Sequence, residues 1–86
     1  AYPPYYYNDL TKKQKVLINS YRAYCKKALK SYDSAQEYFA ELIDLMKDGG
    51  YKPECLFTVY WQHASCYYFM GEKEKCKDRI KRLVNM

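Results

Sequence analysis

The chain has little histidine, glycine and proline, and its four cysteines include no C-x-x-C pair. A single histidine excludes a histidine-rich metal site, and the missing C-x-x-C pair removes the usual ligand spacing of a zinc knuckle. Three glycines and three prolines in 86 residues exclude collagen-like and linker-rich classes. No apolar run is long enough to span a membrane. What remains is one small globular domain, and no reaction can be read from its sequence.

Hydrophobic residues make up 49% of the chain, which is enough to build a core, and twelve residues are tyrosine. Fifteen lysines and arginines against ten acidic residues leave a net charge of +5, which favours acidic partners. The basic residues are spread over several segments at helical spacing, as on a solvated helix surface. We therefore expect a protein or peptide partner, with nucleic acid as the less favoured alternative.

The four cysteines allow two interpretations. They are either small buried thiols of an intracellular helical protein, or two disulfides in a secreted protein whose signal peptide has been removed. In the second case Cys66 would pair with Cys76, because the two lie symmetrically about Gly71, which leaves Cys25 to pair with Cys55. The apolar content makes disulfides unnecessary for folding. Reduced thiols and a cytoplasmic location are therefore favoured, although a mature secreted protein would also lack a signal peptide.

Apolar residues recur at spacings of three and four, which predicts four helices and no strand. The expected helices cover residues 12–30, 33–47, 53–69 and 72–85. Thr11 and Gln14 form a capping-box pattern at the first helix, Pro53 suits the first turn of the third, and Gly71 suits its end. In the first helix we expect the buried face to be the apolar stripe of Leu17, Ile18, Tyr21, Tyr24, Cys25, Ala28 and Leu29.

The chain thus divides into an extended N-terminal arm, residues 1–10, and one helical domain, residues 11–86. The four helices form two antiparallel hairpins, and the second hairpin is similar to the first when Ala35 is aligned with Cys76. This alignment is called the repeat register below. In it, small residues match where helices approach closely, as Ala23 does with Ala64. The predicted fold class is all-α, with two stacked hairpins; a plain four-helix bundle is the alternative.

The second hairpin resembles a tetratricopeptide repeat. Tyr60, Ala64 and Tyr67 place an aromatic, a small and an aromatic residue at the spacing of the family's first helix. Cys76 takes the position usually held by alanine in the second helix. The resemblance covers about residues 16–84, and the first hairpin fits the pattern only in part. It implies a right-handed stack of hairpins.

The third helix has apolar residues on more than one face, which is typical of a helix that is either central or partly covered by a ligand. In tetratricopeptide proteins the first helix of each repeat lines a concave surface that binds extended peptides. Aromatic rings with neighbouring hydrogen-bond donors suit such a ligand. The resemblance therefore implies a peptide-binding face made of Ser20, Tyr24, Lys27, Thr58, Trp61, Gln62, Ser65 and Tyr68.

Chemistry at the histidine is less favoured. His63, Cys66 and Cys76 would supply three metal ligands but no fourth. As a nucleophile pair, Cys66 and His63 lack a third group that would orient them. We expect a buried histidine and an inert thiol, with no catalytic residue, metal or cofactor.

The N-terminal arm contains a match to the PPxY ligand of WW domains, at Pro3, Pro4 and Tyr6. Alternatively, its tyrosines pack against the helices.

The predicted function is a non-enzymatic protein-interaction module that binds a peptide or a partner helix in a groove formed by the first and third helices. The alternative is a secreted, disulfide-stabilised helical effector or toxin acting on a receptor or membrane. A nucleic-acid binder using lysines and tyrosines is a third hypothesis.

Overall fold

The structure is a computed structural model that describes residues 8–85, and over this range it contains four α-helices and no strand. The helices are α2 (Lys12–Ala28), α3 (Tyr32–Asp48), α4 (Pro53–Phe69) and α5 (Lys73–Val84). Each begins and ends within two residues of its predicted bounds, so the all-α fold class is confirmed.

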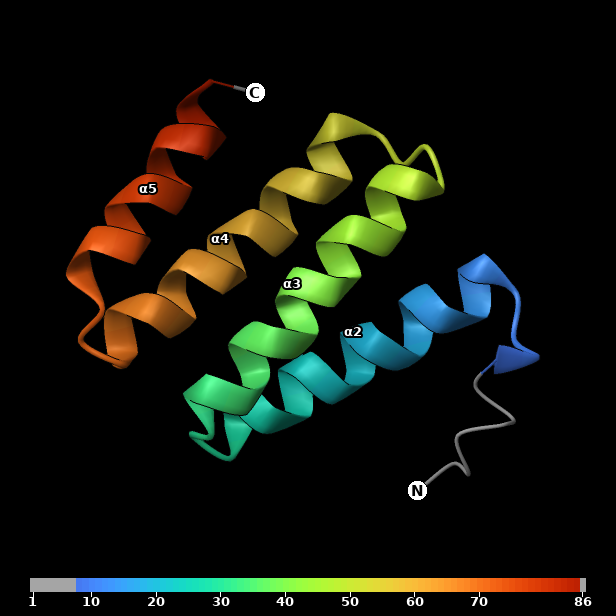
Figure 1. Ribbon diagram of the computed structural model, residues 1–86, viewed down its shortest axis with the longest axis horizontal. Coiled ribbons are helices and arrows are strands. Elements are labelled where there is room, and N and C mark those ends of the chain that lie inside the picture. The colour runs from blue at the N-terminus through green and yellow to red at the C-terminus, as the bar shows by residue number, and fades with distance from the viewer. Residues whose placement is uncertain (1–7, 86) are drawn as a thin grey trace.

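Each helix packs on the one before it, so the array runs α2, α3, α4, α5 (Figure 1). Short connections make successive helices antiparallel, and α2 therefore runs in the same direction as α4. Among the described residues α2 and α5 lie at opposite ends of the array, so the four helices do not close into a bundle.

Local signals explain where two of the helices begin. The Oγ1 of Thr11 accepts a hydrogen bond from the backbone N–H of Gln14 at 3.1 Å, and the backbone N–H of Thr11 donates to Oε1 of Gln14 at 2.9 Å. This is the predicted capping box, which satisfies two amide donors at the start of α2. Pro53 occupies the first turn of α4, where a missing N–H removes no helical hydrogen bond. Ser31 stands at the N-cap of α3, but its side chain makes no capping bond.

The turns within the two hairpins have the same backbone hydrogen bonds. The amide of Ser31 donates to the carbonyl of Lys26 at 2.9 Å, and at the matching positions of the repeat register the amide of Glu72 donates to the carbonyl of Tyr67 at 3.0 Å. Each turn contains one residue in the left-handed region: Lys30 with φ 62° and Gly71 with φ 80°. Glycine adopts this conformation without a Cβ clash, whereas lysine is strained there.

The core lies between the helices and is built around small residues in both hairpins. Ala23, Ala35, Ala64 and Cys76 are all buried, as the repeat register predicts. Because these side chains are short, paired helices approach closely. Larger apolar residues, foremost Phe39, fill the space beside them.

The prediction for the buried face of the first helix is wrong. Leu17 and Tyr21 of the expected stripe are 62% and 74% exposed, while α2 buries Val16, Asn19 and Ala23. The reason is that an amide can be buried when it has a hydrogen bond: Nδ2 of Asn19 donates to a backbone carbonyl one turn earlier at 3.0 Å. A search for apolar periodicity counts asparagine as a surface residue and so selects another face.

Candidate functional site

An apolar groove of about 340 Å³ lies between α4 and α5. Its floor is formed by Ala64 and Cys76, which are 2% and 8% exposed. Its walls are large and open to solvent, since Trp61, Tyr68 and Ile80 are 55%, 66% and 39% exposed. Ser65 and Phe69 complete the lining. The side chains therefore form a hollow whose bottom is closed and whose rim is aromatic; this surface is called the α4–α5 groove below.

Helical spacing explains how α4 and α5 build this groove. Trp61, Ser65 and Tyr68 stand at i, i+4 and i+7 on one face of α4, and Cys76 and Ile80 stand at i and i+4 on α5. The two small floor residues let the helix axes come close, so the larger side chains project on either side of the contact. The rings of Tyr68 and Phe69 meet edge to face, with centroids 5.5 Å apart.

The predicted peptide-binding residues divide between this groove and a separate surface. Trp61, Ser65 and Tyr68 line the α4–α5 groove. The other five residues of the predicted set lie outside it, on α2 and on the rest of α4; they are Ser20, Tyr24, Lys27, Thr58 and Gln62. A binding face across α2 and α4 stays a prediction.

Two contacts describe that second surface. The Nζ of Lys27 donates to Oε1 of Gln62, which links α2 to α4. The ring of Tyr24 meets the buried ring of Phe39 edge to face, at 5.2 Å between centroids, and burial raises the pKa of Tyr24. Ser20 is half-buried and Thr58 is exposed. Part of this face is thus engaged in contacts within the chain.

Sequence reasoning missed the α5 wall of the groove. Cys76 was expected only at the position that alanine usually holds in the second helix of a repeat, and Phe69 was not among the predicted binding residues. The available signal was that α5 has a narrow apolar stripe and that the described chain has no later helix to cover Ile80.

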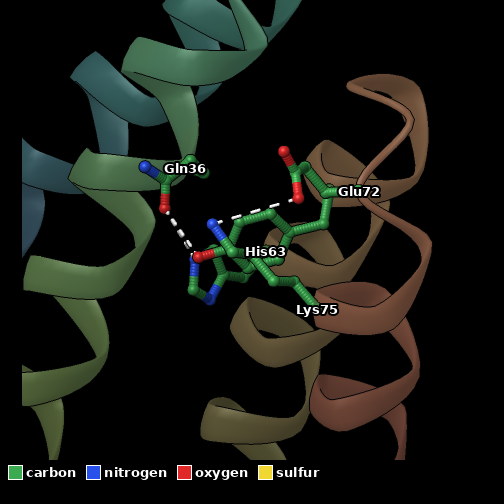
Figure 2. Close-up of polar contacts among 5 residues, drawn as sticks. Gln36, His63, Glu72 and Lys75 are labelled. Carbon is green, nitrogen blue, oxygen red and sulfur yellow. Dashed lines mark hydrogen bonds and ion pairs between the residues drawn. The ribbon is translucent and has the colours of Figure 1, made fainter.

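His63 lies in a small polar cluster between α3 and α4, next to Gln36 (Figure 2). Its side chain is fully buried, and Nε2 lies 3.3 Å from Oε1 of Gln36, which also accepts a hydrogen bond from the Tyr67 hydroxyl at 3.0 Å. Its Nδ1 has no hydrogen-bond partner. Burial and the positive charges of Arg79 and Arg82 lower the pKa of His63 to about 4. The imidazole is therefore neutral at pH 7, as a buried core histidine should be.

The cysteines are described as free thiols, and none of the four forms a disulfide. Cys25 and Cys55 lie near opposite ends of helices that run in the same direction, which separates them along the axes by roughly 15 Å at 1.5 Å per residue. The Cys25–Cys55 pair, which belonged to the less favoured interpretation of the cysteines, is not formed in this structure. Cys66 and Cys76 are both buried as thiols.

Burial raises the pKa of the Cys66 thiol above its usual value, which disfavours the reactive thiolate. Among residues 8–85 there is no group of three histidine, cysteine or acidic side chains that could hold a metal ion. The PPxY match at Pro3, Pro4 and Tyr6 lies outside the described residues.

No helix within residues 8–85 combines the length and the apolar character needed to cross a membrane. Comparison with protein-family models, with curated proteins and with solved structures gives no match to this chain. The resemblance to tetratricopeptide repeats therefore stays a prediction based on the residues that suggested it.

Proposed function

We propose that this protein is a non-enzymatic interaction module that binds a segment of a partner protein in the α4–α5 groove. The observation that carries the proposal is the pairing of a buried floor, Ala64 and Cys76, with exposed walls made by Trp61, Tyr68 and Ile80. Contiguous apolar surface of this kind on a small protein is typical of a binding site.

The identity of the wall residues supports a protein ligand. Tryptophan and tyrosine bury large areas with few rotatable bonds, so they lose little conformational entropy when a partner covers them. Both also carry a polar atom, the indole N–H of Trp61 and the hydroxyl of Tyr68, which can donate a hydrogen bond to a peptide carbonyl. Covering these rings would recover the hydrophobic free energy that is forgone while they face water.

Selection from a displayed library of random peptides tests the proposal directly. We expect peptides selected on the wild-type chain to lose binding to Ile80→Glu, because a carboxylate would then stand in the apolar groove. The matched control is Leu17→Glu, which makes the same change at an exposed aliphatic residue on the far end of the array. Failure to recover any peptide that distinguishes the two variants would overturn the proposal.

A second substitution separates binding from folding. Trp61→Ala should abolish binding of the selected peptides while the circular dichroism spectrum stays unchanged and the free energy of unfolding falls by less than about 1 kcal/mol, because Trp61 is 55% exposed. If the melting temperature collapses instead, Trp61 contributes to the core and the groove is not its main role.

A further inference from the structure

Three residues of the α4–α5 groove have counterparts in the first hairpin, and all three counterparts are buried. In the repeat register the floor of the α4–α5 groove corresponds to Ala23 and Ala35, and Ile80 corresponds to Phe39. These three residues of the first hairpin are all 0% exposed, whereas Ile80 is 39% exposed. The floor positions are therefore buried in both hairpins, and the difference lies at one position, where Phe39 is covered and Ile80 is open.

The helix that covers Phe39 in the first hairpin is α4, which packs on α3. Phe39 belongs to one buried cluster with Val59 and Tyr60 of α4. Lys27, the counterpart of Tyr68 in the repeat register, donates a hydrogen bond to Gln62 of α4. Figure 1 shows α4 lying along α3, and no described helix lies along the outer side of α5. The internal repeat thus indicates that a helix suits the open groove.

The charge on α5 specifies what kind of helix would fit. This helix carries six basic and two acidic side chains. Lys73 and Lys77 precede Ile80 at spacings of seven and three residues, which places them along the exposed side of the groove. Lys75 and Arg79 lie on the opposite flank of α5, over the rings of Tyr67 and Tyr60. A docked helix would therefore face lysines along one edge.

A second copy of this chain does not meet that requirement. The helix at the other end of the array, α2, carries six basic side chains and no acidic one, so copies stacked end to end would oppose like charges. Two α5 helices facing each other would do the same. The one acid-rich helix among those described, α3, has five acidic residues but lies between α2 and α4.

We propose that the α4–α5 groove binds an amphipathic helix of a partner protein, with apolar residues facing Trp61 and Ile80 and with aspartate or glutamate facing Lys73 and Lys77. The helix takes the place on the second hairpin that α4 takes on the first. This inference rests on the proposed function and specifies the partner of the same site.

The only tryptophan in the chain makes the proposal testable, because Trp61 itself stands in the groove. The probes are synthetic 17-residue peptides without tryptophan. One is an amphipathic helix with leucine at i, i+3, i+4 and i+7 and glutamate elsewhere, and one has the same composition in scrambled order. A third replaces glutamate by lysine, and a fourth keeps the acidic sequence but has a central proline that breaks the helix.

The acidic helix should shift Trp61 emission to shorter wavelength in a saturable way, because docking removes the indole from water. We expect it to bind at least tenfold more tightly than each of the other three peptides, and to weaken as salt is added. Scrambling is the control for non-specific attraction between an acidic peptide and a chain of net charge +5.

Matched variants locate the contact. Lys77→Glu should weaken the acidic helix at least fivefold, because it reverses a charge on the groove side of α5. Lys75→Glu should leave the affinity unchanged: each lysine pairs with the glutamate three residues before it, at 3.8 Å for Lys77 and 4.0 Å for Lys75, but Lys75 lies on the other flank. Figure 2 shows the Lys75 pair with Glu72.

The outcomes separate this inference from the proposed function. If the lysine peptide or the proline peptide binds the groove as tightly as the acidic helix, the inference is overturned while the proposed function stands. If Lys77→Glu and Lys75→Glu change the affinity equally, the proposed contact between acidic residues of the partner and the lysines beside the groove is overturned. If no peptide changes Trp61 emission at millimolar concentration and the library yields no groove-dependent binder, the proposed function fails as well.

Discussion

The two hairpins both have small residues where their helices cross, and they differ in whether a further helix packs against the second helix of the hairpin. In the first, α4 packs on α3, and Phe39 is completely buried. In the second, Ile80 at the corresponding position remains 39% exposed beside two exposed aromatic rings. The crossing of two helices therefore needs only small side chains, whereas the burial of the larger residues around it depends on a third helix.

Charge separates the hairpins in the same way. Basic α2 packs on acidic α3, and Nζ of Lys12 lies 2.8 Å from a carboxylate oxygen of Asp48, which lowers the pKa of that carboxyl. The ion pairs of α5 are instead made with acidic residues of its own helix or its N-cap, such as Glu74 with Lys77. The excess of positive charge on α5 has no acidic neighbouring helix in the described chain. An acidic partner would therefore gain favourable electrostatic interaction energy with α5.

The largest expected effect is on the free energy of unfolding, and it distinguishes Phe39 from Ile80, its counterpart in the second hairpin. Phe39→Ala should lower the free energy of unfolding by about 3–5 kcal/mol, because it removes a fully buried ring, whereas Ile80→Ala should lower it by about 1 kcal/mol. Urea unfolding followed by circular dichroism measures both. If Phe39→Ala does not fold, Phe39→Leu gives the comparison at about 1–2 kcal/mol. Equal losses at the two positions would contradict the open second groove.

A smaller effect is expected from pH, since the hairpins also differ at the position of His63. Its counterpart in the repeat register is Arg22, which lies only partly buried over the ring of Tyr38. The pKa of His63 is about 4 in the folded protein against about 6.5 in an unfolded chain, so the unfolded state takes up the proton first as the pH falls. The contribution of neutral His63 to the free energy of unfolding is therefore fully present above pH 6.5. It is lost progressively as the pH falls to 4.

This loss should reach about 2 kcal/mol between pH 7 and pH 4.5. Other groups titrate in the same range, so the measurement is the difference between variants in urea unfolding at each pH. His63→Gln should remove this part of the pH dependence, and Arg22→Gln should leave it in place. A His63→Gln variant with the pH profile of the wild type would show that the imidazole is not held neutral by the fold.

Helix positions could be predicted from the sequence because their signals are local. The Thr11 capping box, Pro53 and the turn at Gly71 each act within a few residues, and all four helices begin and end close to the expected positions. The buried face of α2 could not be predicted in this way. It depends on Asn19, whose burial requires a hydrogen bond that apolar periodicity does not represent.

Three of the seven residues that line the α4–α5 groove were among the predicted binding residues, although the sequence placed them in a groove of the first and third helices. Trp61, Ser65 and Tyr68 stand on a second apolar face of α4, and an apolar face that the core does not need indicates a surface for something else. Ile80 was not among the predicted binding residues, because its exposure follows from the position of α5 at the end of the array. That position is a property of the whole fold, and no local pattern encodes it.

The smallest effects are expected at the two hairpin turns, and they should have opposite signs. Lys30→Gly should raise the free energy of unfolding by about 0.5–1 kcal/mol, because glycine relieves the left-handed strain that lysine carries at φ 62°. Gly71→Ala should lower it by about 1 kcal/mol. An added Cβ at Gly71 meets no atom within 4 Å, so only the backbone conformation is penalised.

Thermal unfolding of the two single variants and of the double variant measures these changes. The turns lie in different hairpins, and the rings of Tyr32 and Phe69 beside them stack with centroids 5.0 Å apart. Lys30 and Gly71 are not part of that stack, so the two effects should add and nearly cancel in the double variant. Lys26→Gly, within helix α2, is the control for Lys30→Gly and should lower stability, because glycine is a poor helix former. If Lys30→Gly were also destabilising, the two turns would not share the backbone conformation that makes the hairpins comparable.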